Sequence, residues 1–424
     1  MNIAEKLFKN PNAYLYHIEI QLQRFMSDMF PQVILSSGKD QSLRRFHPWV
    51  FSGAIKKVKN KSMPKDGEIV EVLDNKDEFL GIGHYQDSSI AVRIFSFEKI
   101  NPDSNFWKSK IQHAFDIRAK LGLTNNSQTN CYRLVFAEGD GLPGLIIDYY
   151  NGTCVMQCHS IGMHLAKNEI AEALREVYGE KLLAIYDKSA ETLPKKFAEG
   201  VKNEYLFGKG TDEQHFIFEN GLSFWADWKS GQKTGFFLDQ RENRQMLARY
   251  SDGKNVLNAF CYTGAFSVYA LNAGANEVHS VDSSKRAIEL AEKNVKLNSF
   301  SGKHKSFAVD VFDFLKGKKD VYDVMILDPP AFAKHYDVRH NALMGYKRLN
   351  MEALRQIKSG GILFTFSCSQ VIDRPLFEKT IMSSAIVAGR KVRVLHHLSQ
   401  APDHAVNIFH PEGEYLKGLV LFVE

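Results

Sequence analysis

Several features that would place a protein in a common class are missing from this 424-residue chain. It has no apolar run of about 18 residues, so we expect no transmembrane helix. Its N-terminus, MNIAEKLFKNPNAYLYHIEIQLQRFM, also lacks the apolar core of a signal peptide. The five cysteines form no CxxC pair and none has zinc-ligand spacing with histidine, so the sequence predicts neither a disulfide framework nor a metal site. We therefore expect a cytoplasmic protein with reduced thiols.

The stretch from Lys254 to Asp282 organises the rest of the chain. An apolar run at Val256 ends in a turn at Gly264, an apolar helix-like segment follows, and a second apolar run closes on Asp282. This order predicts a strand, a tight loop, a helix and a strand with a terminal acid. The acid lies 18 residues beyond Gly264, close to the spacing at which a carboxylate can bind ribose hydroxyls. An ordinary strand-to-helix turn is the competing interpretation.

The loop of this stretch favours one nucleoside cofactor over the others. A dinucleotide needs a GxGxxG turn and a nucleoside triphosphate needs GxxxxGK[ST], whereas this turn has one glycine and no lysine. S-adenosylmethionine carries no phosphate, so it suits a loop of this kind. We predict that this cofactor is bound by Asn258, Phe260, Tyr262, Thr263, Gly264, Asp282 and Ser283.

Three further strand ends carry polar or reactive side chains. Asp310 follows an apolar run with Phe312 two residues on, a pair that suits the amine and ring of adenine. A helix N-cap at Asp310 is the competing interpretation. YDVMILDPP predicts a buried strand ending at Asp328 with a rigid exit, and GGILFTFSCSQ predicts a strand ending beside Cys368. Because ligands bind at the carboxyl ends of strands in open α/β sheets, these residues are expected at one edge.

Cys368 is the candidate nucleophile. A thiolate is the side chain best suited to add to C6 of cytosine, a step that makes C5 nucleophilic, and Asp328 would face the N3/N4 edge of the base. A buried, inert core cysteine is the competing interpretation. Cys261, inside the cofactor loop, is a rival thiol that we expect to face the cofactor or the core.

Changes of pattern divide the chain into four predicted segments. Residues 1–31 predict a helical extension, and 32–101 predict a small β-barrel. Residues 102–205 predict a small α/β unit that begins with a helix. Residues 206–424 begin with a hairpin at Asn220-Gly221 and continue as βαβ repeats, which predicts a doubly wound, mostly parallel sheet. In this last segment, the charged FLDQRENR is expected to form a solvated helix start.

Basic residues cluster near the N-terminus although the net charge is only +5. Aromatic residues are interleaved with them, and this combination suits a phosphate backbone with exposed bases. A solvated face around a core tryptophan is the competing interpretation. We predict RNA contacts by Arg44, Arg45, His47, Trp49, Lys56 and Lys57.

Two groups of strings resemble known families. RRFHPWVFSGAI, GEIVEVLD and FLGIGHYQ resemble a PUA domain, a small RNA-binding β-barrel. GQKTGFFLDQRENR, LNAFCYTGAFSVYA, VDSS, DVFDFL, LDPPAFAK, GGILFTFSCS and APDH…PEGEYLKGL resemble the PUA-containing class I methyltransferases that make 5-methylcytosine in large-subunit ribosomal RNA. The resemblance implies a Rossmann-like domain, S-adenosylmethionine at residues 258–264 and at three acids, and Cys368 as nucleophile. The three acids are Asp282, Asp310 and Asp328.

The resemblance also sets expectations about partners and leaves alternatives open. It implies an RNA partner. No membrane partner is expected, and a homodimer stays open. Ala331 follows Asp-Pro-Pro where a second cysteine would stand in another RNA methyltransferase group, so one active-site thiol is expected. Methylation of guanine N7 or adenine N6 without a cysteine nucleophile stays open. So does RNA binding by a non-catalytic protein.

Overall fold

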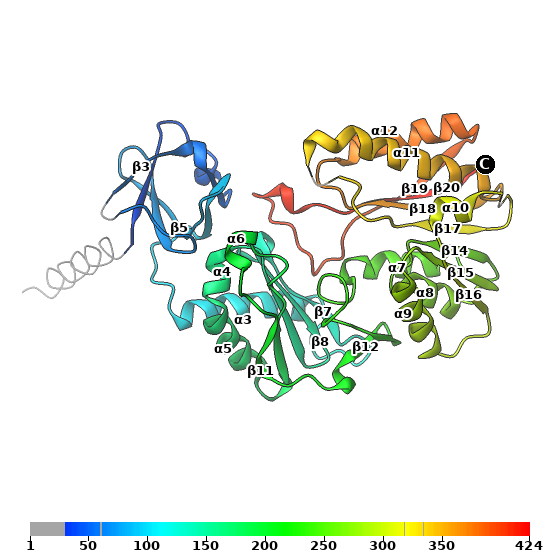
Figure 1. Ribbon diagram of the computed structural model, residues 1–424, viewed down its shortest axis with the longest axis horizontal. Helices are drawn as coiled ribbons and strands as arrows, with labels where there is room; N and C mark the ends of the chain where they lie inside the picture. The colour runs from blue at the N-terminus through cyan, green and yellow to red at the C-terminus, as the bar shows by residue number, and fades with distance from the viewer. Residues whose placement is uncertain (1–29, 60–61, 318, 334) are drawn as a thin grey trace, which may run out of the picture.

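The computed structural model describes residues 30–59, 62–317, 319–333 and 335–424. It contains three large sheets and one separate hairpin. In Figure 1 the N-terminal sheet, in blue, and the central sheet, in cyan to green, lie beside the C-terminal sheet. The segment before the last strand, residues 399–416 and drawn in red, leaves the C-terminal sheet and extends toward the other two sheets. We call it the C-terminal segment. The helical extension predicted for residues 1–31 falls almost entirely outside the described residues.

The N-terminal sheet has six strands in the order β2-β6-β5-β4-β1-β3. Only the β1–β4 pairing is parallel, and Val33, Val72 and Val92 fill its core without solvent exposure. The small β unit that the sequence predicts is confirmed. Its strands are β1 (Gln32–Leu35), β2 (Trp49–Phe51), β3 (Ile55–Lys59), β4 (Ile69–Leu73), β5 (Phe79–Tyr85) and β6 (Ile90–Ser96).

The central sheet has the order β11-β10-β9-β8-β7 and is covered by α3 and α5. Cys154 and Cys158 are buried together with Met156 in the core between sheet and helices, as the alternation of their strand predicts. The elements are α3 (Ser104–Lys120), β7 (Cys131–Phe136), β8 (Leu145–Tyr150), β9 (Thr153–Cys158), α4 (Ile161–Leu165), α5 (Lys167–Tyr178), β10 (Ala184–Asp187), α6 (Lys195–Ala198) and β11 (Glu204–Gly208).

The C-terminal sheet has seven strands in the order β16-β15-β14-β17-β18-β20-β19. The first five are parallel neighbours, and β20 is antiparallel to both β18 and β19. Helices cover both faces, with α8 and α9 on one and α11 and α12 on the other (Figure 1). The doubly wound, mostly parallel sheet is therefore confirmed.

The elements of this sheet alternate along the chain, as βαβ units require. They are β14 (Asn255–Ala259), α8 (Ala265–Asn272), β15 (Glu277–Asp282), α9 (Lys285–Lys296), β16 (Lys303–Ala308), α10 (Val311–Leu315), β17 (Val324–Leu327), α11 (Arg339–Gln356), β18 (Gly361–Ser367), α12 (Arg374–Ala388), β19 (Val392–Leu398) and β20 (Lys417–Val423). Among the described helices, none is long and apolar enough to cross a bilayer.

A hairpin joins the central and C-terminal sheets. Strands β12 (Phe216–Glu219) and β13 (Leu222–Trp225) turn at Asn220 (φ 51°) and Gly221 (φ 78°), the left-handed pair that a two-residue hairpin needs. The amide of Trp225 donates to Asn294 of α9 at 2.7 Å. On the other side, the amide of Asn130, next to β7, donates to the carbonyl of Phe218.

The prediction that FLDQRENR forms a solvated helix start is wrong. Helix α7 (Arg241–Ala248) begins there, but Arg241 and Arg244 are each only 2% exposed. Arg244 donates two hydrogen bonds to the buried Glu219 of β12, at 2.8 and 2.7 Å. Arg241 donates to Asp403 at 2.6 Å. The acidic partners come from the hairpin and from the C-terminal segment, so no local pattern could reveal the burial.

Candidate active site

The predicted strand-end residues meet at one edge of the C-terminal sheet. Strands β15, β14, β17 and β18 are parallel neighbours in that order, so their carboxyl ends share an edge. Asp282 is the last residue of β15, Asp328 directly follows β17, and Cys368 directly follows β18. The structure therefore brings together the ribose acid, the Asp-Pro-Pro acid and the candidate thiol.

The cofactor loop follows β14 and is shaped by left-handed residues. Phe260 (φ 60°), Tyr262 (φ 44°) and Gly264 (φ 72°) all have positive φ. A Cβ on Gly264 would lie 2.7 Å from Cβ of Ala291 in α9, so both the backbone conformation and the packing require glycine. The amide of Tyr262 donates to Oδ2 of Asp282 at 3.1 Å, which ties the loop to the predicted ribose acid.

The other loop residues differ in exposure. Asn258 is buried, and its Nδ2 donates to Ser267 Oγ at 2.9 Å, while its Oδ1 is buried without a partner. Thr263 is buried, and its carbonyl accepts from Asn294 at 2.8 Å. Ser283 is exposed beside Asp282. Asn258 and Thr263 therefore anchor the loop to α8 and α9, and Oδ1 of Asn258 is left as a free hydrogen-bond acceptor.

Asp310 acts as the N-cap of α10. Its Oδ1 accepts from the amides of Phe312 at 2.8 Å and Asp313 at 3.3 Å, which is the competing interpretation of this residue. Phe312 packs against the core, and the guanidinium of Arg348 lies 4.2 Å from its ring centroid. Contact of this pair with adenine remains a prediction.

Asp328 lies in surroundings that favour its protonated form. Gln240 Nε2 donates to its Oδ2 at 3.1 Å. Burial, together with the nearby carboxylate of Asp239, raises the pKa of Asp328 to about 7. The carboxyl group therefore exchanges its proton near neutral pH, as a general acid or base must.

Cys368 is partly exposed, whereas Cys261 is buried. Burial, together with the carboxylate of Asp328, raises the pKa of Cys368 to about 12. Burial likewise raises the pKa of Cys261, which packs against Ile288 and Ala291, and this confirms that it faces the core. Because Cys368 is a thiol at neutral pH, its use as a nucleophile requires a base that removes the proton as the sulfur reacts.

Lys417 and Tyr415 are site residues that sequence reasoning missed. Lys417 is the first residue of β20 and pairs with Ser367, the residue before Cys368. It is 3% exposed, its Nζ donates to the carbonyl of Ser369 at 2.8 Å, and burial lowers its pKa to about 8. Tyr415 donates to Asp239 Oδ2 at 2.6 Å. The search for site residues considered only positions that follow strands, whereas Tyr415 precedes a strand and Lys417 begins one.

Asp239 and Gln240 are two further site residues that the sequence did not predict. They lie in FLDQRENR, for which the sequence predicts a solvated helix start. The Oδ1 atom of Asp239 is buried without a partner. Gln240 is fixed by Asn243, whose Nδ2 donates to Oε1 of Gln240 at 2.5 Å, and it holds Asp328 with its other end. The start of α7 thus brings a carboxylate and an amide to the site.

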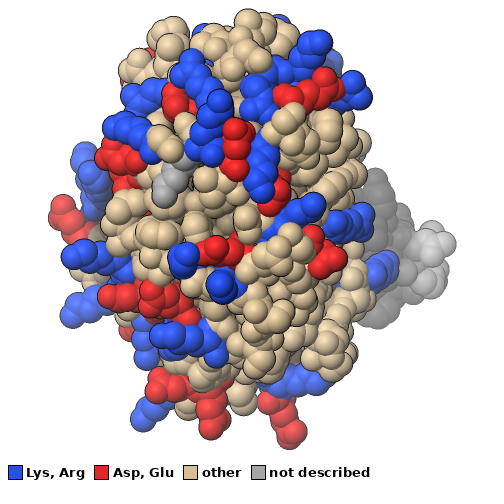
Figure 2. All heavy atoms as spheres, turned by 90° about the vertical axis from the view of Figure 1, so that its right-hand side faces the viewer, with Lys and Arg blue, Asp and Glu red and all other residues tan. Residues whose placement is uncertain are grey.

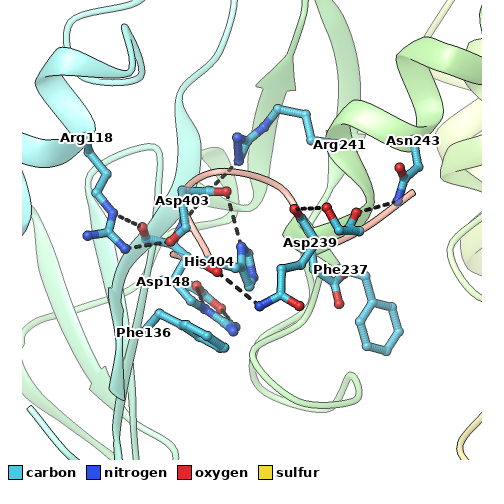
Figure 3. A network of polar contacts seen from close by, with 12 residues as sticks. Arg118, Phe136, Asp148, Phe237, Asp239, Arg241, Asn243, Asp403 and His404 are labelled. Carbon is cyan, nitrogen blue, oxygen red and sulfur yellow. Dashed lines mark hydrogen bonds and ion pairs between the residues drawn. The ribbon is translucent and has the colours of Figure 1, made fainter. Parts of the chain in front are cut away.

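A buried polar network behind the site joins the central sheet to the C-terminal segment (Figure 3). Arg118 of α3 pairs with Asp140 and donates to the carbonyl of Asp403 at 2.5 Å. Asp403 accepts from Arg241 at 2.6 Å. Burial would raise the pKa of Asp403, but Arg241 and His404 hold it well below its usual range. The network fixes α7, and with it Asp239, against the C-terminal segment.

The six predicted RNA-binding residues divide into two groups. Arg44 pairs with Asp40, Asp74 and Glu78, so its guanidinium is occupied within the chain. His47 and Trp49 face the C-terminal segment and its neighbours: His47 Nε2 lies 3.4 Å from Glu412, and Trp49 Nε1 donates to Glu138 at 2.8 Å. Arg45, Lys56 and Lys57 are exposed, as is the paired Arg44.

Comparisons with known proteins match both ends of the chain. Residues 33–97 match the PUA-like domain family, and residues 179–403 match the family of S-adenosylmethionine-dependent methyltransferases. The chain is 41% identical over 402 residues to Ribosomal RNA large subunit methyltransferase I of Aeromonas hydrophila, covering 93% of this chain and 99% of that protein. It is 40% identical to the protein of the same name from Photobacterium profundum, covering 93% and 100%.

A solved structure agrees with this match. A protein from Streptococcus mutans assigned as a SAM-dependent methyltransferase superposes with a TM-score of 0.78 at 26% identity, covering 92% of this chain and 99% of that one. A second solved methyltransferase with the same TM-score and coverage was determined in complex with SAH. This chain therefore belongs to the family of S-adenosylmethionine-dependent methyltransferases that includes the ribosomal RNA large subunit methyltransferases I.

Proposed function

We propose that this enzyme methylates C5 of a cytidine in large-subunit ribosomal RNA, with Cys368 as a covalent nucleophile. The observation that carries the proposal is the placement of Cys368 on the strand next to Asp328, whose pKa lies at about 7. A thiol activates C6 of a pyrimidine, and a carboxyl group near neutrality can supply a proton to N3. Methylation of guanine N7 or adenine N6 needs no such thiol.

The loop after β14 fits S-adenosylmethionine. Gly264 leaves the space that a Cβ would fill, and Asp282 uses one carboxylate oxygen for Tyr262 and the other for the amide of Ser284. Each oxygen keeps a second lone pair that can accept from a ribose hydroxyl. The unpartnered Oδ1 of Asn258 is an acceptor of the kind that an ammonium group needs. When bound, S-adenosylmethionine supplies an electrophilic methyl group.

In the proposed reaction, Lys417 and Asp328 each carry out a separate proton transfer. Lys417 takes the thiol proton of Cys368 as the sulfur forms a bond to C6 of a cytidine that has been flipped out of its stack. The electrons of the C5–C6 double bond move toward N3, which receives a proton from Asp328, and C5 becomes nucleophilic. After methylation the C5 proton is released to water, the C6–S bond breaks and the double bond returns. Asp328 recovers the N3 proton, and Lys417 returns its proton to the sulfur.

Lys417→Met is expected to lower kcat by roughly 10²-fold, because the thiol loses its base. Lys417→Arg should be equally impaired, since a guanidinium keeps the charge but does not accept a proton near neutral pH. In the native enzyme, kcat should rise as Lys417 loses its proton, fall as Asp328 loses its proton, and peak between pH about 7 and about 8. The pH dependence of single-turnover methylation measures the rising and the falling part of this profile.

The matched control is Lys358→Met, which removes a lysine that pairs with Asp323 just before β17, at the opposite edge of the sheet. This variant should keep both the rate and the pH profile. Full activity of Lys417→Arg with an unchanged profile would show that Lys417 contributes charge alone and is not the base.

The exposed basic residues of the N-terminal sheet support the RNA part of the proposal. Arg45, Lys56 and Lys57 are exposed there, and phosphate contacts of this type supply most sequence-independent affinity for RNA. On the face shown in Figure 2, by contrast, Lys and Arg are interspersed with Asp and Glu. The mixed face offers less attraction to a phosphate backbone, so we expect RNA to approach from another side.

Mapping the product tests the proposed function. The enzyme is incubated with labelled S-adenosylmethionine and ribosomal RNA from a strain that lacks it, and the digested nucleosides are separated by mass spectrometry. The expected product is 5-methylcytidine in large-subunit RNA. Label in 7-methylguanosine or N6-methyladenosine would replace this function by one of the alternatives, and transfer to no RNA would leave a binding protein.

A further inference from the structure

We propose that His47, His410 and Glu412 bind a divalent transition metal ion, zinc above all, where the N-terminal sheet meets the C-terminal segment. The three residues offer ligand atoms that all lie within 4.8 Å of one another. Two imidazoles and one carboxylate form a donor set that suits zinc. His47 is separated by more than 360 residues from the other two, so the fold alone assembles the group.

Each imidazole lies close to one carboxylate oxygen of Glu412. His47 Nε2 lies 3.4 Å from Glu412 Oε1, and His410 Nε2 lies 3.7 Å from Glu412 Oε2. With metal–ligand bonds of about 2.0–2.2 Å, neighbouring donors of a tetrahedral zinc site stand about 3.3–3.6 Å apart. The two observed separations, which involve different oxygens of Glu412, are close to this range, and the second one is too long for a hydrogen bond.

His410 supplies a second and independent observation. Its side chain is only 4% exposed, yet neither Nδ1 nor Nε2 has a hydrogen-bond partner. Buried ring nitrogens without partners are rare in folded proteins. The ring cannot turn away, because its centroid lies 4.4 Å from that of Trp49 and 5.3 Å from that of His47. A metal ion bound to Nε2 satisfies the atom in place.

The surroundings leave a path for the ion and its remaining ligand. The Glu412 side chain is about half exposed, so water can reach the group and complete the coordination. The amide of Trp49 lies 3.3 Å from His47 Nδ1, which places the imidazole proton on Nε2 without metal. Binding through Nε2 moves this proton to Nδ1 and gives up that long contact.

The bound ion would hold the N-terminal sheet against the segment that leads to Lys417. The same segment contains Asp403, in the network behind the site, and continues to Lys417. Phe46 and Phe409 pack beside the metal group, with ring centroids 5.4 Å apart. The metal therefore fixes the position of the RNA-binding unit relative to the catalytic edge, and it takes no part in methyl transfer.

Zinc binding by the full-length protein tests the site. Chelator-treated protein is titrated with zinc chloride in a calorimeter, and the melting temperature is followed in parallel. We expect one zinc ion per chain and a higher melting temperature with zinc. Glu412→Gln should weaken binding by at least ~10-fold and remove the zinc-dependent rise in melting temperature. His410→Asn should do the same.

His397→Asn is the matched control, because His397 of β19 forms an exposed pair with Glu378 of α12 at 3.2 Å, outside the proposed metal group. It should bind zinc like the native protein. If the His410 variant fails to fold, Glu412→Gln still tests the site, because the altered side chain is half exposed and its replacement should not disturb folding. Absence of zinc binding by the native protein at a tenfold molar excess would overturn the proposal, and so would unchanged binding by Glu412→Gln.

Discussion

Cys368→Ala is expected to reduce methyl transfer to cytidine by at least ~10⁴-fold, because the proposed bond to C6 requires the sulfur of Cys368. The substitution removes only one sulfur atom from a partly exposed position after β18, so the fold and the cofactor loop should persist. Binding of S-adenosylmethionine should therefore stay close to native. Single-turnover methylation and calorimetric titration with the cofactor measure the two quantities.

Cys261→Ala is the matched control for this prediction. Cys261 is a buried thiol of the same sheet edge, and its loss should leave most activity intact. RNA that contains 5-fluorocytidine adds a direct readout, because fluorine at C5 blocks the final elimination and traps the adduct. The native enzyme should form a covalent RNA complex and Cys368→Ala should not. Native-level methylation by Cys368→Ala would eliminate the covalent mechanism.

The sequence predicted the site residues at the carboxyl ends of the parallel strands, because the relevant signals are local. An apolar run, a glycine turn and a terminal acid are contiguous between Lys254 and Asp282. Asp328 and Cys368 also directly follow apolar runs. Once the strands are recognised as parallel neighbours, topology alone places these residues at one edge. The order of the strands was not needed for that conclusion.

The sequence could not predict the residues that enter from outside the parallel strands. Lys417 reaches Ser369 only because β20 inserts antiparallel beside β18. Asp239 and Gln240 lie at the site because Arg241 is held by Asp403, 162 residues away. A charged helix start is solvated by default, and only its distant partners show otherwise. The same limit applies to His47 and His410, whose spacing in the chain resembles no metal motif.

Asp328→Asn is expected to lower kcat by roughly 10²- to 10⁴-fold, because an amide has the shape of the carboxyl group but cannot protonate N3. The folded-state pKa of Asp328 is raised to about 7, so the native acid is active below this pH and lost above it. The alkaline limb of the pH profile should therefore disappear in the variant. Single-turnover rates between pH 6 and about 9 measure both effects.

The stability of Asp328→Asn should change in the opposite direction from its activity. A raised folded-state pKa means that the ionised carboxylate destabilises the fold as pH rises through about 7, and asparagine removes that charge. The variant should thus melt no lower than the native enzyme at pH about 8. Asp323→Asn is the control: Asp323 accepts from the amide of Asn255 and pairs with Lys358, so its loss should lower the melting temperature and spare kcat. If Asp328→Asn lost activity and melting temperature together, Asp328 would be a structural residue and the proton at N3 would need another source.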